Sequence, residues 1–289
     1  MKFLHNMFDR MEPSFVKGGK HEKYYPIFEM FDTFLRQPDS TTFTSSHVRD
    51  GIDLKRIMIT VWMCTFPAMF FGMYNVGHQA LTAIAELGLQ ADGWRTIITG
   101  MVGYNPENIW ACFVYGAMQF LPIYIVTFVV GITCEILFAI TRGHDVNEGF
   151  FVTSVLYALI MPPDIPLWQV ALGIMFGVVV AKEVFGGTGK NFLNPALSGR
   201  AFLYFAYPSY ISGDSVWTAV DGFSGATPLG LAALGVAPED FTNVYGQAIT
   251  WTDAFLGNIQ GSVGEVSTLA ILFGAAVLLW TRIASWRIM

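Results

Sequence analysis

Long apolar runs separated by short polar segments limit what this chain of 289 residues can fold into. A helix needs about 20 apolar residues to cross a bilayer core. Only 13% of the residues are charged, against roughly 25% in soluble domains. Backbone groups inside a bilayer must be paired within their own segment, so we expect an all-α polytopic membrane protein with about five to six membrane segments. The runs cover residues 57–74, 109–140, 149–161, 167–180, 196–207 and 266–283.

Several of these runs are short for a full crossing, or contain or border proline. Pro122 lies inside the run 109–140 and predicts a kink or a break. Asn194 and Pro195 open the run 196–207, in an order that suits a helix N-cap followed by the first helical position. Short, interrupted segments are typical of the discontinuous helices that hold ligands in transporters. We favour such helices over slightly longer ones whose ends carry Ser and Asn.

The basic residues indicate how the chain threads the membrane. Residues 1–56 hold nine of the sixteen Lys and Arg and predict a cytoplasmic N-terminal arm, with an amphipathic helix near 25–35. Polar segments 75–108 and 209–266 are expected outside as periplasmic loops, because the first has one basic residue and 201–281 has none. The remaining basic residues, up to Arg200 and then from Arg282, fall on the cytoplasmic side. Residues 57–289 form the membrane domain.

Other function classes find little support. A pI of about 5.3 and the lack of a basic helix argue against a nucleic-acid partner. Three Cys and five His residues show no metal-ligand spacing, so we assign no metal site. Residues 186–190 resemble a phosphate-binding loop, but Val184 stands where a Gly is required and Asn191 where a Ser or Thr is required.

Glu135 is an ionisable side chain inside an apolar run, which makes it a functional candidate by default. Gly131 lies one helical turn away and would leave room for a flat ligand beside it. The alternative is that Glu135 reaches the cytoplasmic interface with an extended side chain.

The segment Asp221–Thr227 lies in the long loop that lacks Lys and Arg, and its last four residues are Ser-Gly-Ala-Thr. Small neighbours leave the Thr227 hydroxyl sterically open, although a turn beside a helix-capping Thr is the plainer interpretation. The motif resembles the flavin-attachment site of the NqrB subunits of Na+-translocating NADH:quinone reductases. Further similar blocks are residues 18–23, 46–50, 53–58, 146–151, 186–200 and 261–268.

This resemblance implies membership of a six-subunit complex in the bacterial inner membrane, with a cytoplasmic N-terminus and a flavin-binding domain at 57–289. FMN would be attached to Thr227 through a phosphoester by a dedicated flavin transferase. Asn191 and Asn194 would be candidates for a riboflavin pocket, where amides bond the polar edge of the ring or only the local backbone. The family continues past residue 289, so this domain is expected to be incomplete at its C-terminus.

The resemblance also implies roles on the cytoplasmic side. Gly131 and Glu135 match positions tied to ubiquinone, and Glu29 and Glu135 match acidic residues linked to Na+ uptake. Electrons would pass from FMN through riboflavin to ubiquinone while Na+ is exported. Two alternatives remain: the RnfD subunit of the ion-translocating ferredoxin:NAD+ oxidoreductase, which shares the Ser-Gly-Ala-Thr motif, and a channel or solute carrier without redox chemistry.

Overall fold

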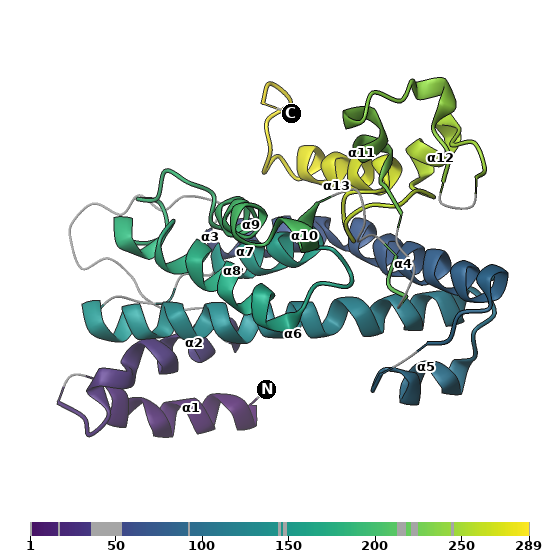
Figure 1. The fold of residues 1–289 in the computed structure, drawn as a ribbon. Helices are drawn as coiled ribbons and strands as arrows, with labels where there is room; N and C mark the ends of the chain where they lie inside the picture. Colours follow the sequence, from purple (N-terminus) through teal and green to yellow (C-terminus); the bar gives the residue numbers. More distant parts are fainter. Residues whose placement is uncertain are drawn as a thin grey trace.

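The chain folds as a bundle of helices of very unequal length (Figure 1). The computed structural model describes residues 2–16, 18–35, 54–91, 93–143, 146, 149–212, 218–220, 225–243 and 246–288. Within them the only strand-like pairing is an isolated antiparallel bridge between Thr242 and Ala248. Three helical stretches are long and apolar enough to cross a membrane, namely Arg56–Leu87, Ile109–Arg142 and Leu167–Phe185. With the shorter apolar helices Gly149–Leu159 and Thr268–Trp280, they confirm an all-α polytopic membrane protein.

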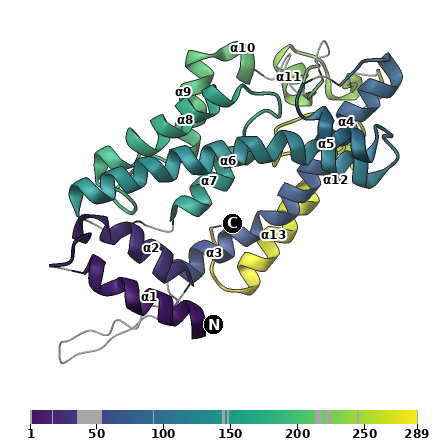
Figure 2. The same cartoon turned by 90° about the horizontal axis from the view of Figure 1, so that it is seen from below.

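The N-terminal arm contains helix α1 (Lys2–Phe15), a 3-10 turn at Glu22–Tyr24 and helix α2 (Tyr25–Leu35). The amphipathic helix expected near 25–35 is therefore present. Phe28 packs against the rings of Phe8 and Phe15, with centroids 5.8 and 5.0 Å away, which joins the two helices. Figure 2 shows this pair beside the membrane bundle. The blocks 46–50 and 221–224 lie outside the described residues.

The first span is longer than the sequence indicates. It comprises α3 (Leu54–Cys64) and α4 (Phe66–Leu87), so residues 75–87 are helical and do not belong to an exposed loop. The polar residues Asn75 and Gln79 suggested a loop, but both are buried. Asn75 Nδ2 donates to the carbonyl of Ile259 at 2.8 Å, a partner 184 residues away. Pairing of this kind removes the cost of a buried amide.

Helix α5 (Thr96–Val102) leads into the longest element, α6 (Ile109–Arg142). The helix runs through Pro122 without a break, contrary to one of the two outcomes that the sequence predicted. Proline leaves the carbonyl four residues earlier without its helical donor. That carbonyl belongs to Met118, and it accepts a hydrogen bond from Arg95 Nε at 3.1 Å. Arg95 thus supplies the missing partner from outside the helix.

The second half of the chain consists of shorter elements. Helices α8 and α9 pack closely, since a Cβ on Gly199 would come within 2.5 Å of the Gly173 carbonyl oxygen. Asn194 caps α9 and Pro195 is its first residue, as predicted. The elements are α7 (Gly149–Leu159), α8 (Leu167–Val179), a 3-10 turn (Glu183–Phe185), α9 (Pro195–Ala206), α10 (Pro208–Ile211), α11 (Pro228–Ala233), a 3-10 turn (Pro238–Asp240), α12 (Trp251–Leu256) and α13 (Thr268–Trp280).

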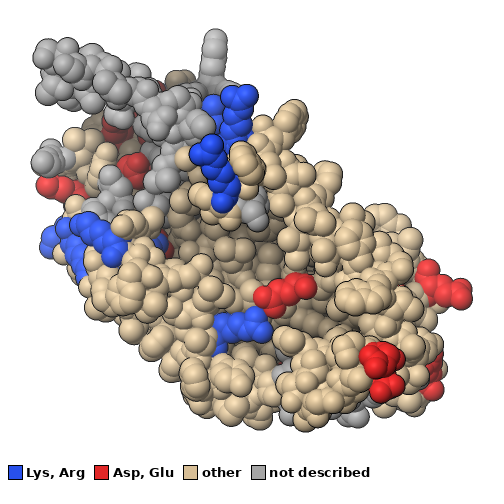
Figure 3. Space-filling view, turned by 90° about the horizontal axis from the view of Figure 1, so that it is seen from above, with Lys and Arg blue, Asp and Glu red and all other residues tan. Residues whose placement is uncertain are grey.

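The connecting segments gather at opposite ends of the bundle. Helices α5 and α12 lie toward the end where α6 begins, whereas α1 and α2 lie toward its other half (Figures 1 and 2). Seen from above, most visible Lys and Arg side chains lie at one side and the opposite side shows only acidic groups (Figure 3). The surface between them is mostly uncharged and hollowed, with one basic and one acidic group visible near its centre. This arrangement suits a helical bundle that crosses an apolar layer.

Candidate functional site

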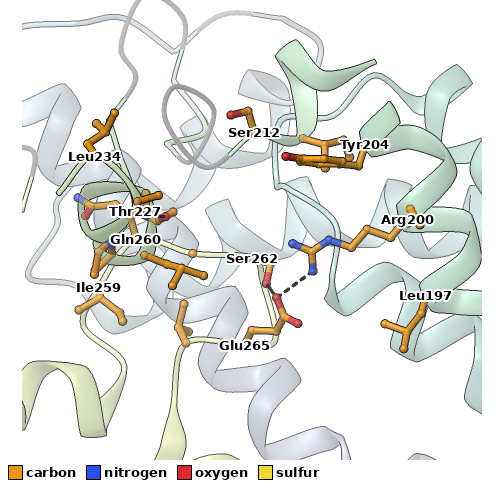
Figure 4. A pocket seen from close by; sticks show the side chains of 18 of the residues that line it. Leu197, Arg200, Tyr204, Ser212, Thr227, Leu234, Ile259, Gln260, Ser262 and Glu265 are labelled. Carbon is orange, nitrogen blue, oxygen red and sulfur yellow. Dashed lines mark hydrogen bonds and ion pairs between the residues drawn. The ribbon is translucent and has the colours of Figure 1, made fainter. Parts of the chain in front are cut away.

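A pocket of about 840 Å³ opens between α9, α11 and the segment that precedes α13 (Figure 4). Ligand pockets usually measure roughly 300–1,000 Å³ and combine apolar walls with a few polar groups. Here the walls are mostly apolar, and the polar side chains come from three separate parts of the chain. The lining residues that matter below are Arg200 and Tyr204 of α9, Thr227 and Leu234 around α11, and Gln260, Ser262 and Glu265 before α13.

The segment from Gly257 to Ser267 forms one wall of the pocket and is irregular but deeply packed. Gly257 leaves α12 with φ 99°, a conformation that favours glycine. The Gly264 N–H donates to the carbonyl of Leu159 at 2.9 Å, at the end of α7. A Cβ on Gly72 would come within 1.7 Å of the Val263 carbonyl oxygen, so α4 also lies against this segment. These residues of the predicted loop are therefore packed against α4 and α7, and the external position of 209–266 stays a prediction.

Thr227 is positioned by the start of α11. Its Oγ1 accepts a hydrogen bond from the Gly230 N–H at 3.0 Å, which makes Thr227 the N-cap of the helix. The side chain is only 7% exposed, so the hydroxyl is not open to bulk solvent as its small neighbours suggested. Because Thr227 lines the pocket, a ligand that fills the pocket reaches the hydroxyl directly.

An ion pair crosses the pocket opposite Thr227. Arg200 Nη1 donates to Glu265 Oε2 at 3.1 Å, and the Ser262 hydroxyl donates to the same oxygen. Figure 4 shows the Arg200 guanidinium directed inward, toward Ser262 and Glu265. From the sequence we expected Arg200 among the cytoplasmic basic residues and Glu265 in an external loop. The Arg200–Glu265 ion pair was therefore not predicted. The one available signal was that Arg200 is the last basic residue before Arg282.

Gln260 lies beside Thr227 in the pocket wall and is 2% exposed. Its Nε2 donates to Gln79 Oε1 at 3.4 Å. Its Oε1 has no hydrogen-bond partner within the part of the chain that the structure describes. A buried acceptor without a donor is costly.

A second polar cluster lies away from the pocket, between α6 and the turn after α8. Lys182 Nζ contacts Glu135 Oε1, and the two side chains are 4% and 3% exposed. Glu135 is therefore buried and paired, and it does not extend to the interface. Arg142 Nη1 donates to the Glu183 carbonyl at 2.6 Å and lies 3.6 Å from its carboxylate. Glu183 is also buried.

The surroundings of Gly131 differ from what the sequence indicated. A Cβ on Gly131 would come within 2.3 Å of the Phe150 ring and 3.2 Å of Ile174. The space expected for a flat ligand is thus filled by Phe150. Gly131 and Glu135 do share one face of α6, as the helical spacing predicts, and both are buried.

The remaining predicted residues are spread over the fold. Asn191 Nδ2 donates to the Leu193 carbonyl at 2.8 Å, and Asn194 Oδ1 accepts from the Ala196 N–H at 2.9 Å. Both amides thus bond the local backbone. They precede α9, whose next turns carry Leu197 and Arg200 into the pocket. Glu29 is half-buried on α2.

Comparison with known proteins gives a consistent result. The sequence pattern of the NQR2, RnfD, RnfE family matches residues 41–289. The NqrB subunit of a Na(+)-translocating NADH-quinone reductase from Pseudomonas paraeruginosa is 64% identical over 99% of this chain and 71% of its own length. The corresponding protein of Chromohalobacter salexigens, which carries the same name, is 65% identical over 99% of this chain and 69% of its own length. The protein of the same name from Azotobacter vinelandii is 62% identical over 97% of this chain and 70% of its own length.

Proposed function

The chain belongs to the NQR2, RnfD, RnfE family, and we propose that it acts as the NqrB subunit of a Na+-translocating NADH-quinone reductase. In this role it is a membrane component of a multi-subunit oxidoreductase that reduces quinone and moves Na+. Its relatives of 62–65% identity all carry that name. Three helical stretches that could cross a membrane fit a membrane component.

The pocket beside Thr227 is the place where this chain holds FMN, attached to the Thr227 oxygen through a phosphoester. When bound, FMN supplies one- and two-electron chemistry that side chains lack. The observation that carries the assignment is that the Ser-Gly-Ala-Thr threonine lines a pocket of about 840 Å³. The residues present fit the group: Thr227 and Gln260 at one side, apolar and aromatic walls, and a guanidinium at the other side (Figure 4).

We also propose roles for residues outside this pocket. Asn191 and Asn194 are the proposed riboflavin contacts, and the axial rise of α9 puts Arg200 about 9 Å beyond Asn194. Helix α9 would then link the two flavins. Gly131 and Glu135 are the proposed quinone contacts, and Glu29 and Glu135 the proposed acids of the Na+ route. Glu135 is buried and paired with Lys182, so Na+ binding at this carboxylate would require displacement of the Lys182 ammonium group.

The assembly is proposed to be a six-subunit complex in the bacterial inner membrane, with ubiquinone as acceptor. Residues 1–56 are proposed to face the cytoplasm, and most of 209–266, with Thr227, the periplasm. A dedicated flavin transferase would attach the FMN.

The attachment is tested by expressing Thr227→Ala and wild type with the transferase and the other subunits, then measuring in-gel flavin fluorescence. We expect wild type to fluoresce and Thr227→Ala to be dark. Thr250→Ala is the matched control, because Thr250 also caps a short helix of the same loop and accepts from the Asp253 N–H at 3.2 Å. Thr250→Ala should lose a cap and keep its fluorescence. A fluorescent Thr227→Ala chain contradicts the assignment.

A further inference from the structure

We propose that Arg200 stabilises negative charge on the ring of the flavin and so sets its reduction potential, with Glu265 as the opposing charge that moderates it. This inference rests on the proposed function, in which FMN is attached at Thr227. It concerns residues that lie across the pocket from the attachment point. Arg200 and Tyr204 lie on one side of the pocket and Thr227 on the other (Figure 4).

The first observation is the geometry of Arg200. It projects from α9 with its guanidinium directed into the pocket, and its side chain is 29% exposed. A guanidinium has five N–H donors in a fixed plane. One nitrogen bonds Glu265 Oε2 at 3.1 Å, which orients the group and leaves donors for a ligand. The part of the lining contributed by described residues contains no other Lys or Arg.

The second observation is that Gln260 lines the same pocket on the side of Thr227. Gln260 Oε1 is buried and lacks a partner among the described residues. It lies beside Thr227 (Figure 4), where the hydroxyl-bearing chain between phosphate and ring would begin. An FMN attached at Thr227 would fill the pocket from that side, and Arg200 lines the opposite side.

The direction in which each side chain shifts the reduction potential of the flavin follows from its charge. An isoalloxazine ring gains electrons on reduction, and its pyrimidine edge carries the added negative charge. A cation near that edge favours the reduced form, and an anion disfavours it. Both side chains line the pocket, so each acts on a ring held there at short range. Arg200 and Glu265 should therefore shift the potential in opposite directions.

The experiment is a spectroelectrochemical titration of the covalent FMN in the purified complex, comparing wild type with Arg200→Gln and Glu265→Gln. We expect the FMN midpoint to become more negative in Arg200→Gln and more positive in Glu265→Gln. Arg200→Lys, which keeps the charge, should fall between Arg200→Gln and wild type. Lys190→Gln, which removes an exposed charge outside the pocket lining, should leave the midpoint unchanged.

In-gel fluorescence of each variant separates the two claims. If wild type is not fluorescent, the proposed attachment fails. If the variants are fluorescent but neither midpoint moves, or both move in the same direction, the role of Arg200 is wrong while the attachment stands. Should Arg200→Gln fail to assemble, the positive shift expected of Glu265→Gln still decides the question, since loss of packing alone would not favour the reduced flavin.

Discussion

Glu135 and Lys182 form a buried ion pair, whereas Arg200 and Glu265 form an open one, with side chains 29% and 51% exposed. Removing one partner of a buried pair leaves an uncompensated charge in an apolar environment, which typically costs about 3–5 kcal/mol. An exposed pair contributes about 0–1 kcal/mol. The two pairs should therefore respond differently to the same kind of substitution.

We expect Lys182→Met to destabilise the assembled complex by about 3–5 kcal/mol, because Glu135 would stay buried without its cation. The double variant Glu135→Gln with Lys182→Met should recover most of that loss, since no charge remains buried. Thermal inactivation of the purified complex measures both. Arg200→Gln is the control and should change stability by about 1 kcal/mol or less. Equal losses in the single and double variants would contradict a direct ion pair.

Substitution of Gly131 can test the proposed quinone site, provided that the effect of the new contact with Phe150 is measured separately. Gly131→Ala places a methyl group 2.3 Å from the Phe150 ring, so Phe150 must move. If quinone binds at this face, the apparent KM for quinone should rise while NADH still reduces the FMN. Phe150→Leu added to Gly131→Ala relieves the contact, and the raised KM should persist. A KM restored to the wild-type value in the double variant would attribute the effect to packing alone.

At the scale of elements, apolar periodicity and N-cap chemistry predicted most helices, including α2, α7 and α9. The failures arose where a distant residue supplies a hydrogen-bond partner. Asn75 ended the predicted first span, but its partner is the carbonyl of Ile259. Of the kink or break predicted at Pro122, the break does not occur, and Arg95 bonds the freed carbonyl of Met118. A single sequence contains no signal for such partners until the fold brings them together.

Helices α4 and α6 meet through glycines that no apolar pattern reveals. A Cβ on Gly116 would come within 1.7 Å of the Met73 carbonyl oxygen. A Cβ on Gly77 would come within 1.7 Å of the Cys112 carbonyl oxygen. We expect Gly116→Val to prevent close packing of the two helices and to abolish accumulation of the protein in membranes, as measured by immunoblotting. Gly100→Ala should accumulate normally, because its Cβ would lie 3.7 Å from the Tyr104 hydroxyl. Normal accumulation of Gly116→Val would refute the packing.

Over the whole molecule, the distribution of charge predicts which segments share a side of the membrane, and this threading stays a prediction; Figure 3 shows most visible Lys and Arg side chains toward one side. That distribution does not reveal the Arg200–Glu265 ion pair, nor the packing of residues 257–267 against α4 and α7 as irregular backbone. Irregular backbone within a membrane protein is tolerated where it is buried in protein or lines a cavity. This segment does both, and the pocket that it helps to form could not be predicted from the sequence.

The proposed orientation can be tested with single cysteines in a background without Cys64, Cys112 and Cys134. Lys190→Cys and Glu239→Cys are suitable, because both side chains are exposed. An impermeant thiol reagent added to intact cells should label position 239 and not position 190. After permeabilisation both should be labelled. Labelling of position 190 in intact cells would reverse the proposed threading.

The central claim is that Thr227 carries FMN within the pocket formed by α9, α11 and the segment before α13. The most direct measurement is the mass of the chymotryptic peptide that contains Thr227, taken from the chain purified with its transferase and partner subunits. The account predicts a peptide heavier by FMN less one water, with fragmentation that assigns the added mass to Thr227. An unmodified peptide, or added mass on another residue, would contradict it.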